Sequence, residues 1–110
     1  MKNKKDIAHD WLKRYTGTDP KKYGDWILLT NFQNYVEKFA ERFDVKINGM
    51  GGPMTSAINS DGLSIINFGI GSANASTIMD LLSSATPKGV LFLCKCGGLK
   101  KTTDIGHFIL

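Results

Sequence analysis

The chain has 110 residues, of which 42% are hydrophobic and 22% charged, and its formal net charge is +4. This composition is typical of one globular domain and excludes a disordered chain. Residues 1–22 hold seven Lys or Arg against three Asp, whereas residues 23–110 hold seven residues of each sign. We therefore expect a basic N-terminal helix or arm (1–22) on a neutral body. A nucleic-acid footprint would instead spread over a face and include stacking aromatics.

No apolar run approaches the roughly 20 residues that a membrane helix needs, and the charged start lacks the apolar block of a secretory signal. We therefore expect a cytoplasmic protein without nucleic-acid or membrane partners. Cys94 and Cys96 would point to one side of a strand, but no further Cys or His completes a tetrahedral metal site. We expect reduced cysteines, at least one of them buried, and neither a metal nor another cofactor.

The N-terminal part predicts a short helix over 6–15, with Ile7, Trp11 and Leu12 on its apolar face, ended by the breakers at 16–20. Trp26–Leu29 is an apolar run of strand length.

The first strand is followed by Thr30 and Gln33, which have the spacing of a capping box. The helix Phe32–Phe43 should begin there. Its apolar residues fall at helical spacing on one face: Phe32, Val36, Phe39, Ala40 and Phe43.

The middle of the chain predicts a short alternating strand over 45–48 and a loop or hairpin over 49–62. A buried strand over Leu63–Phe68 and a helix over Ala73–Ser84 follow. The buried stripe of that helix should comprise Ala75, Ile78, Met79 and Leu82.

The apolar run Gly89–Leu93 does not alternate, so it suits a strand covered on both faces. Residues 105–110 look like the start of another strand, and the chain ends inside it. Strands alternating with helices indicate a mainly parallel sheet with right-handed crossovers. The apolar end suggests that the segment is incomplete or pairs with another chain.

A Gly-x-Gly turn ends the central strand and opens the next helix, at Gly69, Gly71 and Ser72. Glycines let a ligand approach the backbone, and the free amides of a first helical turn suit an anionic or hydroxyl-rich group. A second glycine turn, 95–98, follows the next apolar run. A dinucleotide site would need an acidic residue about 20 positions after the first turn. The chain has Lys95 and Cys96 in that region, which disfavours this alternative.

Two segments, "INFGIGSANAS" and "FLCKCGGLKKTTDIGHFIL", resemble the nucleoside phosphorylase and nucleosidase superfamily. Within it, "RYTGTDPKKYGDWILLTNFQNYVEKFA" and "LLSSATPKGVLFLCKCGGLKK" are similar to the short bacterial AMP nucleosidases. The resemblance covers nearly the whole chain but only about the N-terminal half of such an enzyme. It implies an α/β three-layer fold, with 23–110 as the N-terminal part of one domain, and usually a homo-oligomer.

The resemblance also implies hydrolysis of the N-glycosidic bond of AMP to adenine and ribose 5-phosphate. The implied ribose and purine pocket comprises Gly69, Gly71, Ser72, Lys95, Cys96 and Gly97. Phosphorylases of this superfamily hold phosphate with a Gly-Asp-Pro-x-Arg loop and a further Arg. This chain has Asn31–Tyr35 and Phe92 there instead. Losing guanidinium clamps favours water over phosphate as the nucleophile.

Cys94 stands where the AMP nucleosidase pattern has Gly, and its side chain could crowd the second turn. The acid that protonates the leaving purine lies in the second half of the family's enzymes. Asp80 and Asp104 do not match it and are expected to be surface charges. We therefore expect no catalytic residue in this segment and no activity of the 110 residues alone. A phosphorylase-type transferase and a non-catalytic nucleotide-binding or assembly fragment remain as alternatives.

Overall fold

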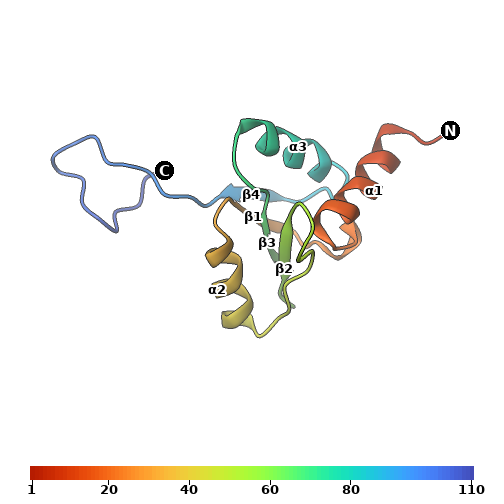
Figure 1. Cartoon of the computed structure of the whole chain (residues 1–110), viewed down its shortest axis with the longest axis horizontal. Coiled ribbons are helices and arrows are strands. Elements are labelled where there is room, and N and C mark those ends of the chain that lie inside the picture. The colour runs from red at the N-terminus through yellow and green to blue at the C-terminus, as the bar shows by residue number, and fades with distance from the viewer.

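The computed structural model describes residues 1–110 and contains four helical segments and four strands (Figure 1). In chain order they are α1 (Lys4–Thr16), the 3₁₀ helix η1 (Pro20–Lys22), β1 (Trp26–Thr30), α2 (Gln33–Phe43), β2 (Thr55–Ile58), β3 (Leu63–Asn67), α3 (Ser72–Leu82) and β4 (Gly89–Phe92). The helices and strands expected over 6–15, 26–29, 32–43, 63–68, 73–84 and 89–93 are therefore confirmed. No helix is both long and apolar enough to cross a membrane.

The four strands form one sheet in the order β2-β3-β1-β4. β1 runs parallel to β3 and to β4, while β2 runs antiparallel to β3, which confirms the mainly parallel sheet. β2 arises within the predicted loop or hairpin 49–62. The strand predicted over 45–48 is wrong, because only Asn48 reaches the sheet, through one bridge to Ser56.

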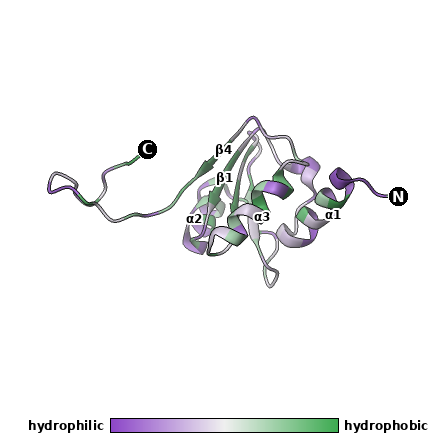
Figure 2. Cartoon of the chain, turned by 90° about the horizontal axis from the view of Figure 1, so that it is seen from above, coloured by the Kyte–Doolittle hydropathy of each residue, from purple (hydrophilic) through white to green (hydrophobic).

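Helices cover both faces of the sheet, as Figure 2 shows from above, so the three-layer α/β fold is confirmed. On one face, α1 and α3 pack on β1 and β3 through residues such as Leu12, Ile78 and Ile66. On the other face, α2 packs on β2 and β3 through Val36 and its neighbours.

The buried side of α1 differs from the prediction. Leu12 is buried, but Ile7 and Trp11 are about half exposed, and Ala8 lies in the core instead. Helical periodicity fixes which residues share a face. The small side chain of Ala8 lets α1 approach α3 closely. Which face of α1 is buried in the core is decided by this packing and not by the periodicity alone. Met79 of α3 is likewise half exposed and does not belong to the buried stripe.

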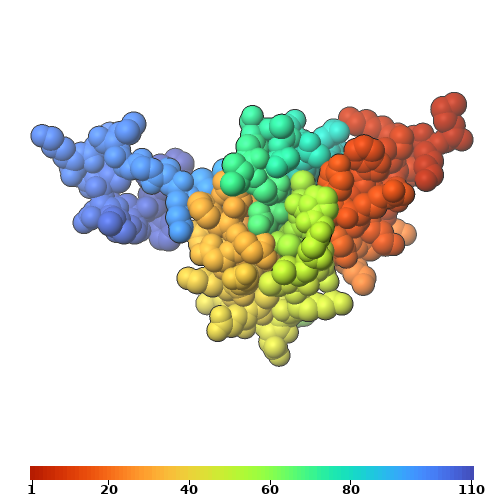
Figure 3. Space-filling model, in the orientation of Figure 1, coloured from red at the N-terminus to blue at the C-terminus, as the bar shows by residue number.

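The segment after β4 departs most from the prediction. Residues 93–110 form no strand, and beyond Leu93, whose N–H still donates to the Leu29 carbonyl, they extend away from the body (Figures 1 and 3). A strand needs a neighbouring strand for its backbone hydrogen bonds, and no strand lies beside residues 105–110. Cys94 and Cys96 are both exposed, so the expected burial of one cysteine is wrong. β4 is an edge strand with Leu91 and Phe92 half exposed, not a strand covered on both faces.

Candidate functional site

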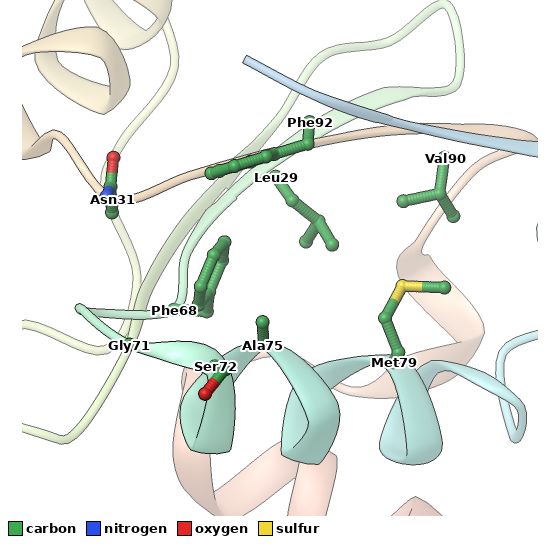
Figure 4. A pocket seen from close by; sticks show the side chains of 9 residues that line it. All are labelled: Leu29, Asn31, Phe68, Gly71, Ser72, Ala75, Met79, Val90 and Phe92. Carbon is green, nitrogen blue, oxygen red and sulfur yellow. The ribbon is translucent and has the colours of Figure 1, made fainter. Parts of the chain in front are cut away.

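A pocket of about 390 Å³ opens between α3 and the carboxyl ends of β1, β3 and β4. In open parallel α/β sheets, ligands bind at this edge. Figure 4 shows the lining side chains, which belong to the carboxyl edge of the sheet on one side and to α3 on the other. They are Leu29, Asn31, Phe68, Gly71, Ser72, Ala75, Met79, Val90 and Phe92.

The glycine turn forms the polar rim of this pocket. Gly69 has φ +86°, and Gly71 has φ 101° and ψ 157°, conformations that L-residues with a Cβ avoid. Gly71 is the N-cap of α3 and offers no side chain to its first turn. The amide donors at the start of α3 therefore remain available to a ligand.

A chain of side-chain hydrogen bonds supports the turn from behind. Gln33 Oε1 accepts from Thr55 Oγ1 at 2.6 Å and from Asn67 Nδ2 at 2.9 Å. Asn67 Oδ1 in turn accepts from the Gly69 backbone N–H at 3.0 Å. The first residue of α2, β2, the end of β3 and the glycine turn are thus connected.

The capping box predicted at Thr30 and Gln33 is wrong. Phe32 is the N-cap of α2 and has no side-chain cap, while Thr30 Oγ1 accepts from the Phe32 N–H at 3.1 Å. The Gln33 side chain does not bind the backbone at the start of the helix, because it accepts hydrogen bonds from Thr55 and Asn67, which are distant in the sequence.

Two buried polar atoms, one just before α2 and one in its first residue, have no partner in the protein. They are the acceptor Asn31 Oδ1, on the pocket wall, and the donor Gln33 Nε2. Buried polar groups are normally paired, so a ligand or water is expected to satisfy them. Asn31 directly follows β1 and Asn67 ends β3, and a polar residue at the carboxyl end of a parallel strand is a sequence signal that could have found both. Gln33, Phe68 and Met79 carried no such signal.

The second glycine turn lies apart from the pocket. Lys95 Nζ stands 5.0 Å from the ring centroid of Phe32 and 5.6 Å from that of Tyr35, which are cation–π distances. Cys96 and Gly97 are exposed and do not line the pocket. Of the six predicted pocket residues, the structure brings only Gly71 and Ser72 into the pocket, with Gly69 in the adjoining turn.

The pocket lining contains no ionisable side chain. Asp80 is exposed and pairs with Lys4 at 3.1 Å, and Asp104 is also exposed, so both are surface charges as predicted. No group of three or more His, Cys, Asp or Glu residues is placed to hold a metal.

No family profile matches the chain. Over 96% of its length it is 27% identical to the AMP nucleosidase of Escherichia coli K12, and equally to that of strain O157:H7. The crystal structure of AMP nucleosidase from Bacteroides thetaiotaomicron superposes with a TM-score of 0.83 over 89% of this chain, at 50% identity. The chain spans 29% of the two curated relatives and 42% of that crystallised chain.

The sheet order, the flanking helices and this superposition define an α/β protein with the nucleoside-phosphorylase-like fold. The pocket lies at the carboxyl edge of the sheet, where open parallel α/β sheets bind ligands. Within that class, the similarity of the chain is to the AMP nucleosidases, and it corresponds to less than half of their length.

Proposed function

We propose that this chain forms the N-terminal, ligand-binding part of an enzyme that hydrolyses the N-glycosidic bond of AMP, releasing adenine and ribose 5-phosphate. The observation that carries this proposal is the 50% identity to an AMP nucleosidase across 89% of the chain. Residues 23–110 would be the N-terminal part of one domain, and 1–22 its basic extension.

The proposed ribose side of the site comprises Gly69, Gly71 and Ser72. The positive-φ backbone of Gly69 and Gly71, and the uncapped start of α3 at Ser72, support contact with hydroxyl or phosphate oxygens. Lys95, Cys96 and Gly97 are proposed to complete the purine side. The aromatic pair Phe32 and Tyr35 would keep the ammonium of Lys95 near the carboxyl end of β1.

The composition of the pocket favours hydrolysis over phosphorolysis. Phosphate is usually held by bidentate arginines, and Phe92 and Asn31 stand on this wall. Water needs no such anchor. We therefore propose water as the nucleophile.

The chemical step needs a proton donor for the purine, an effect typically worth ~10²–10⁴-fold in rate. None of the residues that line the pocket can donate this proton, because none has an ionisable side chain. We therefore propose that residues 1–110 alone bind nucleotide without turnover. A non-catalytic binding module is the alternative that the same observation favours.

The proposed activity is tested by measuring adenine release from AMP, with and without phosphate. The two samples are the 110-residue chain and the chain extended by the C-terminal part of the B. thetaiotaomicron relative. We expect phosphate-independent release by the extended protein alone. Phosphate-dependent formation of ribose 1,5-bisphosphate would identify a phosphorylase, and turnover by the short chain would show that it contains the catalytic group.

We further propose that the protein acts in the cytoplasm as a homo-oligomer. The resemblance supports the homo-oligomeric state. The open edge of β4 and the half-exposed Leu91 on it also support self-association.

A further inference from the structure

Gln33 occupies an unusual position for the first residue of a helix. Its side chain turns away from the start of α2 and receives two hydrogen bonds, from Thr55 on β2 and from Asn67 at the end of β3. A glutamine at this place in a helix would ordinarily remain in solvent or serve the helix end. Here its amide oxygen joins three elements that lie far apart in the sequence.

The bond from Asn67 has a direct consequence for the pocket. Because Asn67 Nδ2 donates to Gln33, the other atom of the same amide, Oδ1, faces the Gly69 N–H and accepts from it at 3.0 Å. A free asparagine side chain could rotate about χ2 and present either atom. Gln33 therefore selects the orientation of Asn67 that binds the glycine turn.

We propose that Gln33 is a positioning residue. Through Asn67 it fixes the Gly69–Gly71 turn in the conformation that presents the amides of α3 to the ligand. The part of this inference that concerns the ligand rests on the proposed function. The part that concerns the turn does not. Gly71 leads directly into α3 and its pocket wall, so a shift of the turn moves Ser72 as well.

The turn itself is tested by NMR hydrogen exchange in the 110-residue chain. Gln33→Met keeps the length of the side chain but removes the accepting oxygen. We expect the Gly69 amide to exchange about tenfold faster, while the amide of Ile65, inside β3, changes less than twofold. Asn34→Met is the matched control, because Asn34 is the next residue, is exposed and makes no side-chain hydrogen bond. We expect this control to leave the exchange rates of the Gly69 and Ile65 amides unchanged.

Gln33→Glu distinguishes positioning from filling of space. A carboxylate keeps the oxygen that accepts from Thr55 and Asn67, and the start of a helix tolerates its charge. Protection of Gly69 should therefore return to within twofold of the original chain. If the Gln33→Met variant does not fold, Thr55→Val serves in its place, because it removes one of the two groups that donate to Gln33. We expect it to make hydrogen exchange of the Gly69 amide about threefold faster. Unchanged Gly69 exchange, or equally fast exchange in the Met and Glu variants, would overturn the inference.

AMP affinity, measured by titration calorimetry on the same variants, separates this inference from the proposed function. We expect binding about fivefold weaker in Gln33→Met, restored in Gln33→Glu and unchanged in Asn34→Met. Equal affinity in all variants would refute the part of the inference that concerns the ligand and leave the proposed function intact. If no variant binds AMP but Gly69 exchange responds as expected, the proposed function fails and the positioning of the turn stands.

Discussion

Gly71 adopts φ 101° and ψ 157°, in a region of backbone conformation that is essentially restricted to glycine. A Cβ added there would meet no atom within 4 Å, so only the backbone opposes a side chain. We expect Gly71→Ala to lower the free energy of unfolding by about 1–3 kcal/mol, measured by urea denaturation. Gly97→Ala is the control, since Gly97 has open space and no positive φ. Equal effects of the two substitutions would contradict the role of strain.

The buried hydroxyl of Tyr23 leads to a prediction about how stability depends on pH. Burial raises the pKa of its hydroxyl, and the neighbouring hydroxyls of Ser56, Thr16 and Thr18 only partly offset this. The Tyr23 oxygen lies near them without a hydrogen bond of acceptable geometry. A raised pKa in the folded state means that folding favours the protonated phenol. Its contribution is therefore fully present below the ordinary pKa of about 10 and is lost as the pH rises above it.

Tyr23→Phe should remove this part of the alkaline dependence. Near pH 7 the substitution should change the free energy of unfolding by less than about 1 kcal/mol, because no hydrogen bond is lost. Urea denaturation of both proteins between neutral pH and pH 11 measures the difference. A Phe variant that loses stability above pH 10 as steeply as the original chain would contradict the assignment to Tyr23.

Among the elements, α1 packs against α3 through one side only. Leu12 is 0% exposed and Ile7 is 45% exposed, although both lie on the stripe that the sequence favours. We expect Leu12→Ala to cost about 2–5 kcal/mol of unfolding free energy, because it leaves a cavity. Ile7→Ala should cost less than about 1 kcal/mol. The comparison uses thermal and urea unfolding, and a larger loss at Ile7 would show that the helix is turned differently.

The whole molecule has an elongated outline, 56 × 30 × 27 Å, because residues 93–110 extend from a smaller body (Figure 3). β4 exposes one edge and the side chain of Leu91, and an unprotected edge strand can pair with another chain. We expect the 110-residue chain to self-associate at micromolar concentration in sedimentation velocity runs.

Leu91→Lys should shift this equilibrium toward monomer, because it places a charge on the exposed strand. Met50→Lys is the control, since Met50 is also exposed to solvent but lies in a turn that is not part of the sheet. A stable monomer of the original chain, or the same shift in both variants, would contradict the role of β4.

The sequence alone determined the helices α1, α2 and α3, the strands β1, β3 and β4, the mainly parallel sheet and the glycine turn before α3. Each of these depends on residues within one short segment: apolar periodicity in α2 and β3, and the conformational freedom of Gly69 and Gly71. The resemblance of longer segments then indicated the fold and the class of relatives.

Only the tertiary structure decided which side of α1 is buried, that β4 is an edge strand, and that Gln33 binds Thr55 and Asn67. These features depend on neighbours that are distant in the sequence. The burial of a strand is set by what lies on either side of it, and the partner of a polar side chain by which groups the fold brings within about 3 Å. No local pattern contains that information, because the free energy of such contacts arises only when the whole chain is packed.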